Sequence, residues 1–64
     1  MNYSKVLKLL RDKLLISQTE LAEMLGVSFQ TVNRWETGKH EPTIKAKRKI
    51  KVLLEENNIT VEEE

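Results

Sequence analysis

A group of side chains between residues 29 and 37 combines amide, guanidinium, hydroxyl and phenyl groups. Its members are Phe29, Gln30, Asn33, Arg34 and Thr37. Their spacings of three and four residues place them on one face of a helix. An amide can donate and accept at an adenine edge, a guanidinium can form two bonds with guanine, and a phenyl ring can contact a thymine methyl. Glu36, a carboxylate that would repel phosphate, is expected to lie off this face.

Capping residues and a glycine predict a sharp corner immediately before this segment. Ser17 and Glu20 have the spacing of a capping box, in which each side chain accepts a hydrogen bond from the other residue's backbone amide. Gly26 suits the left-handed position after a helix, where a Cβ would be costly. Ser28 is expected to cap the helix that follows. Two short helices joined by such a corner form a helix-turn-helix.

Apolar periodicity predicts an all-α domain, because no alternating strand pattern persists. The expected helices run from about residue 3 or 4 to 15, from 18 to about 25, from about 29 to 37, and from about 43 or 44 to 56 or 57. The residues expected to be buried are Leu7, Leu14, Leu21, Ala22, Leu25, Val32 and Trp35. The expected inner face of the last helix consists of Ile44, Ile50, Leu53 and Leu54. Residues 1–57 would form the domain, and residues 58–64 an acidic, frayed tail in which Ile59 and Val61 could touch the core.

Length and composition restrict the function classes. The chain has 64 residues, no cysteine and one histidine, which allows one small domain and no thiolate metal site. Ser17 and Ser28 are better explained as caps than as nucleophiles, so we expect no catalytic activity, no cofactor and no metal. Apolar runs fall short of the roughly 18 residues that cross a bilayer. We expect a soluble cytoplasmic protein without a membrane partner.

The charge is divided along the chain. Residues 39–51 contain six basic residues and one acidic residue, whereas residues 52–64 contain five acidic residues and no basic one. A basic block of this kind is compatible with a polyanionic partner and also with a solvated helix face. Because the bases surround a helix, we expect at most two or three of them to lie near phosphate.

Residues 3 to about 54 resemble the phage-repressor and Cro family of helix-turn-helix domains, also called the Xre family. The resemblance is carried by QTELAEMLGVSFQTVNRWETG, from Gln18 to Gly38, with Arg11 upstream. It implies a compact, lambda-repressor-like domain of four to five helices that binds double-stranded DNA, usually as a transcriptional regulator. Its recognition helix, about residues 29–37 here, would enter the major groove.

The resemblance also implies a role for individual residues. Those expected to contact bases are Phe29, Gln30, Asn33 and Arg34, with Asn33 close to bases or backbone. Those expected to contact phosphates are Ser17, Gln18, Ser28, Thr37 and Lys39. Arg11 and Glu36 match a charge pair that ties the first helix to the end of the third.

Several alternatives stay open at this point. Many family members have a fifth helix or a separate domain that dimerises, whereas this chain has one long last helix, so a homodimer on DNA is possible but its surface is undefined. The chain could also be a DNA-targeting module of a larger protein. The exposed Phe29 would equally suit a protein-interaction module that uses the same helix face. A steep salt dependence of binding would favour DNA, because neutralised phosphates release counterions.

Overall fold

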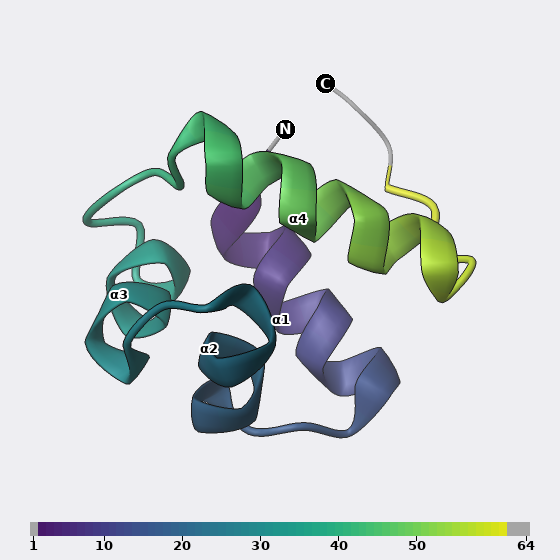
Figure 1. The fold of residues 1–64 in the computed structure, drawn as a ribbon, viewed down its shortest axis with the longest axis horizontal. Coiled ribbons are helices and arrows are strands. Elements are labelled where there is room, and N and C mark those ends of the chain that lie inside the picture. The colour runs from purple at the N-terminus through teal and green to yellow at the C-terminus, as the bar shows by residue number, and fades with distance from the viewer. Residues whose placement is uncertain (1, 62–64) are drawn as a thin grey trace.

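Four α-helices build the part of the chain that the computed structural model describes, residues 2–61 (Figure 1). They are α1 (Tyr3–Leu14), α2 (Gln18–Leu25), α3 (Phe29–Glu36) and α4 (Ile44–Glu56). Within these residues there is no strand, so the predicted all-α fold is confirmed, and four is the helix number found. The last residues of the predicted tail, 62–64, lie outside the described residues.

Each helix begins at a polar side chain that satisfies one of its free amide groups. The N-caps are Asn2, Ser17, Ser28 and Thr43, and each accepts a hydrogen bond from the backbone amide three residues further on. Ser17 and Glu20 form the complete capping box that the sequence predicts. Because such caps satisfy amides that the helix itself leaves free, they fix where each helix begins.

The helix ends depend on residues with left-handed backbone angles. Gly26 has φ 71° and caps α2 as predicted. The helices α1 and α3 each end one residue before the predicted boundary. After α1, Leu15 adopts a left-handed conformation with φ 56° and is 88% exposed. After α3, Thr37 is the C-cap, and Gly38 follows with φ 79°.

The core draws on all four helices. Its members are Val6, Leu7, Leu10, Leu21, Ala22, Leu25, Val32, Trp35, Ala46, Ile50 and Leu54. Six of the seven residues predicted to be buried belong to it. Leu14, the seventh, is only partly buried, because the last residue of α1 packs at the margin of the core. The predicted inner face of α4 is wrong at Ile44, which is 68% exposed. Ala46 occupies the first buried position of that helix.

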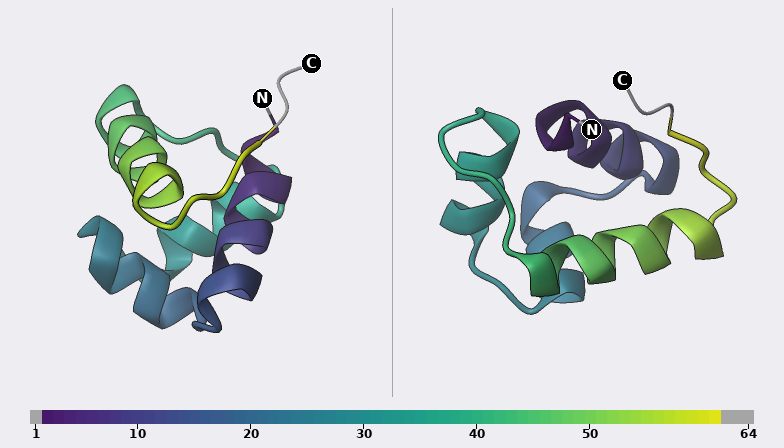
Figure 2. Two further views of the ribbon diagram at one scale, coloured as in Figure 1. Left: turned by 90° about the vertical axis from the view of Figure 1, so that its right-hand side faces the viewer. Right: turned by 90° about the horizontal axis from the view of Figure 1, so that it is seen from above.

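The segment after α4 returns toward α1. The backbone turns at Asn58, which has φ 54°, and the following residues run back beside α1 in both views of Figure 2. Ile59 and Val61 are partly buried against the core, a contact that the sequence had suggested for both. The predicted tail is therefore anchored by two apolar side chains as far as residue 61.

The corner between α2 and α3 is braced from α4. Lys49 donates a hydrogen bond from Nζ to the carbonyl oxygen of Leu25 at 3.2 Å. A positive charge there is favourable because the carbonyl groups at a helix C-terminus carry partial negative charge. Meanwhile α3 packs against α1 and α2. These contacts leave the opposite side of α3 open to solvent.

Candidate nucleic-acid interface

The two sides of α3 differ in exposure as the sequence predicts. Val32, Trp35 and Glu36 are buried. Among the side chains predicted to contact DNA, those of α3 and its C-cap are all exposed, namely Phe29, Gln30, Asn33, Arg34 and Thr37. Ser17, Ser28 and Lys39 are exposed as well, whereas Gln18 is partly buried. Phe29, although apolar, is 49% exposed. The outer face of α3, defined by the five residues of the helix and its C-cap, therefore presents amide, guanidinium, hydroxyl and phenyl groups to solvent, while the carboxylate of the helix is withdrawn into the protein.

Glu36 receives hydrogen bonds from two other helices. Arg11 of α1 donates from Nε to Oε2 at 2.7 Å and from its second terminal nitrogen to Oε1 at 2.8 Å. Gln18, the first residue of α2, donates from Nε2 to Oε1 at 3.1 Å. The side chain of Glu36 is 2% exposed, and that of Arg11 is 27% exposed. The pair that the resemblance implies is thus present, and its acidic partner is fully buried.

The environment of Glu36 favours its charged form. Burial raises the pKa of this carboxyl. Hydrogen bonds from Arg11 and Gln18, together with the charges of Arg11 and Lys8, lower the pKa by more than burial raises it, so it lies below its ordinary value. The hydrogen bond with Glu36 also raises the pKa of Arg11 above its ordinary value, although burial opposes this. Both groups are therefore charged at neutral pH.

The hydroxyl groups predicted to contact phosphate already have partners. Thr37 donates from Oγ1 to the carbonyl oxygens of Asn33 and Arg34, at 3.0 and 3.2 Å. The hydroxyls of Ser28 and Thr31 lie 2.8 Å apart and share a hydrogen bond. Since a phosphate oxygen only accepts, Thr37 could serve it only after releasing its bond to the helix.

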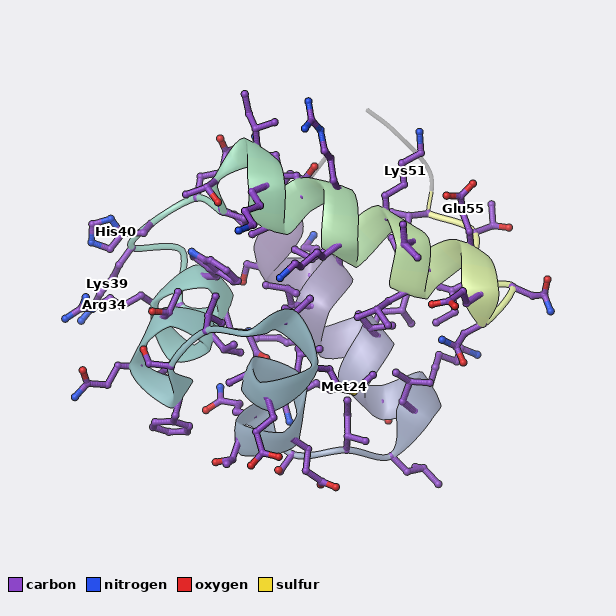
Figure 3. All side chains as sticks on the ribbon, viewed as in Figure 1. Met24, Arg34, Lys39, His40, Lys51 and Glu55 are labelled. Carbon is purple, nitrogen blue, oxygen red and sulfur yellow. The ribbon has the colours of Figure 1, made fainter. Side chains whose placement is uncertain are left out.

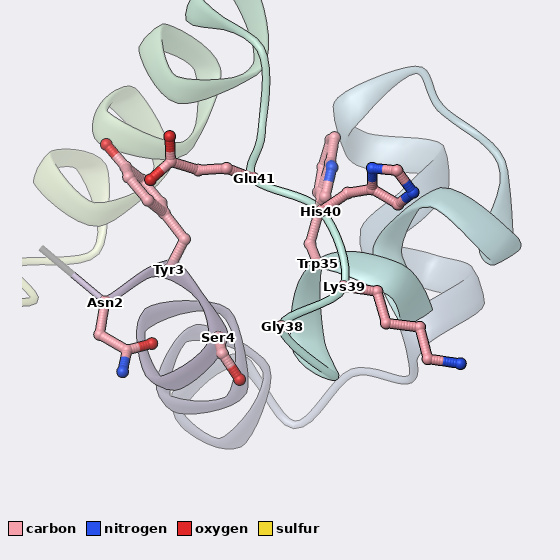
Figure 4. A pocket seen from close by; sticks show the side chains of 8 residues that line it. All are labelled: Asn2, Tyr3, Ser4, Trp35, Gly38, Lys39, His40 and Glu41. Carbon is pink, nitrogen blue, oxygen red and sulfur yellow. The ribbon is translucent and has the colours of Figure 1, made fainter.

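Nitrogen-bearing side chains lie at the C-terminal end of the outer face. Lys39 and His40 donate backbone hydrogen bonds to the carbonyl oxygen of Arg34, at 3.0 and 3.4 Å, which holds this loop against α3. The side chains of Arg34, Lys39 and His40 gather on one side of the molecule (Figure 3). In the close view of the pocket between this loop and the start of α1, Lys39 and His40 point away from Tyr3 (Figure 4). Lys39 thus offers its charge beside the outer face of α3.

A family model described as helix-turn-helix matches residues 7–50, which include α2, the corner and α3. The chain belongs to this family, the Xre or lambda-repressor-like helix-turn-helix domains. No curated protein and no solved structure matched the sequence. Membership establishes a DNA-binding helix-turn-helix domain of the kind used in transcription regulation.

Two contacts of this helix-turn-helix domain were not predicted from the sequence. Gln18 was interpreted as a phosphate contact, yet its amide hydrogen-bonds Glu36. Ser4 donates its hydroxyl hydrogen to the carbonyl oxygen of Glu36, which joins the start of α1 to the end of α3. Spacing within one helix carries no signal for either contact, because each joins residues of different helices.

Within residues 2–61 there is no cluster of three or more histidine, aspartate or glutamate side chains that could hold a metal ion. Among these residues, too, no helix has the length and apolar character required to cross a membrane. The candidate site is the outer face of α3 with Lys39 beside it, because these side chains are exposed.

Proposed function

We propose that this protein binds specific sequences of double-stranded DNA by placing α3 in the major groove, and that it regulates transcription in this way. The observation that carries the proposal is the sorting of polar groups on α3. Gln30, Asn33 and Arg34 are exposed, whereas Glu36 is buried. Base edges present donors and acceptors that amide and guanidinium groups can match, and the carboxylate that would repel the backbone is out of reach.

The surroundings of α3 supply a way to hold the DNA backbone. Lys39 stands beside the outer face and carries a charge that would neutralise one phosphate. Ser17, Gln18, Ser28 and Thr37 are the further phosphate contacts of the proposal, but Gln18 and Thr37 already donate internal hydrogen bonds that a phosphate would have to replace. The first backbone contact is accordingly assigned to Lys39, and base reading to Phe29, Gln30, Asn33 and Arg34. The proposal includes no catalytic step.

Selection of bound sequences from random duplex DNA tests the proposal. We expect an enriched motif and an affinity that falls steeply as salt rises, because bound cations release counterions from phosphates. A two-fold symmetric motif, with half-sites about one helical turn apart, would establish a homodimer on DNA. A single asymmetric half-site would indicate a monomer or a targeting module of a larger protein.

The rival function is a protein-interaction module, which the half-exposed Phe29 favours. Aromatic residues are enriched at the centres of protein interfaces. If the selection yields no enriched motif and binding to any duplex is weak and nearly independent of salt, the DNA proposal is wrong. Retention of a protein partner by the wild type, and its loss in Phe29→Ala, would then support the rival.

A further inference from the structure

The amide of Gln18 makes two contacts that join a buried charge to the outer face of α3. Its Nε2 atom lies 3.1 Å from Oε1 of Glu36 and 3.5 Å from Oδ1 of Asn33. Glu36 is buried and Asn33 is exposed. An amide nitrogen carries two hydrogens, so these two contacts use both of them, and a phosphate could receive one only if a contact were broken.

The chemistry of Glu36 determines which way both amides face. An ionised carboxylate only accepts hydrogen bonds, and Arg11 on its other side keeps it ionised. The oxygen of Gln18 cannot replace Nε2 there without placing two acceptors 3.1 Å apart. Asn33 must then turn its oxygen toward Gln18, because its nitrogen would place two hydrogen-bond donors, Nδ2 of Asn33 and Nε2 of Gln18, against each other. The orientation of an amide follows from its hydrogen-bond partners. Here the series of partners begins at the carboxylate of Glu36, which can only accept hydrogen bonds.

We propose that Glu36, acting through Gln18, orients the Asn33 amide so that its Nδ2 group faces the DNA, and that Gln18 is a positioning residue for base recognition. This inference rests on the proposed function. A donor at that point matches the acceptors on purine and thymine edges in the major groove: N7, guanine O6 and thymine O4. Cytosine presents an amino donor there instead, so Asn33 would reject cytosine at the position it contacts.

An orienting contact at Gln18 and a phosphate contact at Gln18 predict different effects on DNA binding. Phosphate contacts hold the protein on DNA but carry no sequence information. Loss of a phosphate contact would weaken binding to every sequence by one factor. Loss of an orienting contact would instead reduce the preference at the single base pair that Asn33 reads, because the freed amide could turn over and offer its oxygen.

The test is a double-mutant cycle on a selected duplex and on three duplexes that carry the other base pairs at the position Asn33 reads. The variants are Gln18→Met, which keeps the length of the side chain without the amide, Asn33→Ala, and the double variant. Thr19→Ala, an exposed neighbour in the same turn of α2, is the matched control. A thermal unfolding curve for each variant establishes that the protein measured is folded.

We expect Asn33→Ala to weaken binding to the preferred duplex roughly 2- to 10-fold, as for one lost hydrogen bond, and to remove the discrimination against cytosine. Gln18→Met should reduce that same discrimination and cause no further loss of discrimination in the Asn33→Ala background, because coupled residues are non-additive. Thr19→Ala should leave the preference unchanged. The inference would be overturned if Gln18→Met weakened binding equally on all four duplexes, or if the losses of discrimination in Gln18→Met and Asn33→Ala were additive. A wild-type preference for cytosine would overturn it as well.

A second readout needs no DNA and separates this inference from the proposed function. In the free protein, ¹⁵N relaxation of the Asn33 side-chain amide should show greater mobility in Gln18→Met than in wild type or Thr19→Ala. Unchanged mobility would overturn the orienting role, even for a protein that binds DNA specifically. Absence of any sequence preference in the wild type, with the mobility change present, would overturn the proposed function and leave the orienting contact standing.

Discussion

Glu36 is the residue at which α1, α2 and α3 are joined by polar contacts. Its carboxylate accepts from Arg11 and Gln18, and its carbonyl oxygen accepts from Ser4. A buried charge is tolerated only where it is paired and its remaining lone pairs are satisfied. This arrangement fixes the end of α3 relative to α1, so it determines the direction in which the outer face points.

Removing Arg11 should damage the fold more than neutralising Glu36. Arg11→Ala leaves a carboxylate that is 2% exposed without its ionic partner, and breaking a buried pair in this way costs about 3–5 kcal/mol. Glu36→Gln leaves the charge on Arg11, whose side chain is 27% exposed and reaches water. Chemical denaturation at neutral pH should therefore show a larger loss of unfolding free energy for Arg11→Ala.

The pair of Arg11 and Glu36 should also make the difference in stability between wild type and Arg11→Ala depend on pH. In wild type the pKa of Glu36 is lower when folded than when unfolded, so its stabilising contribution is present above about pH 4.3 and is lost as the pH falls further. In Arg11→Ala, burial would raise the folded pKa, so acid should relieve the penalty by protonating the carboxyl. The gap in unfolding free energy between the two proteins should shrink from pH 7 to about pH 4; a constant gap, or none at pH 7, would contradict this account.

Arg34 and Lys39 should differ in what they contribute to DNA binding. If Arg34 binds guanine through two hydrogen bonds, Arg34→Ala should cost about 1–3 kcal/mol on the preferred duplex and relax preference at one base pair. Lys39→Ala should weaken all sequences about equally and lower the salt slope by about one unit. Titrations on a selected and a scrambled duplex at several salt concentrations measure both effects. An equal loss on both duplexes for Arg34→Ala would show that Arg34 is not a base reader.

At the residue scale, the sequence predicts which side chains are exposed better than it predicts which residues they contact. The outer face of α3 follows from its spacing alone, and the structure exposes each of its members. The pair of Arg11 with Glu36 was implied only by the family resemblance, because the two residues are far apart in the chain. The bonds of Gln18 to Glu36 and Asn33 depend on how α2 crosses α3, which spacing within a single helix cannot specify.

At the scale of elements, local chemistry determines where the helices start. Ser17, Ser28 and Thr43 each cap a helix by a hydrogen bond to the amide three residues on, and the sequence identified two of these caps directly. Helix ends are less predictable, since α1 ends at a left-handed leucine without any glycine signal. The exposed Ile44 was misassigned for a related reason: an apolar residue in the first turn of a helix can lie outside the buried face.

Replacing Leu15 by glycine should stabilise the protein. Leu15 has φ 56° and is 88% exposed, so its side chain adds strain while contributing little packing. The left-handed conformation costs a residue with a Cβ about 1–2 kcal/mol, and the greater unfolded-state freedom of glycine offsets about 0.5–1 kcal/mol of that gain. Leu15→Gly should raise the unfolding free energy by roughly 0.5–1 kcal/mol. Leu15→Ala keeps the strain and is the control; equal stability of the two variants would contradict the explanation.

At the scale of the whole molecule, the sequence predicts the fold class, the helix order and the corner. The path of the chain after α4 could be stated only as a possibility, because the two apolar residues in it, Ile59 and Val61, give no periodic signal. The placement of Lys49 against the end of α2 was also unforeseen, since a lysine within a basic run looks like a solvated residue. Long-range contacts therefore supply the parts of the site that local patterns leave out.

We propose the outer face of α3 as the surface that contacts DNA. A two-dimensional NMR titration of the protein with its selected duplex tests it most directly, with a scrambled duplex as control. We expect the largest perturbations with the selected duplex at Gln30, Asn33, Arg34 and Lys39, and smaller ones with the scrambled duplex. Perturbations confined to the exposed side of α4 around Val52, or none with either duplex, would contradict the account.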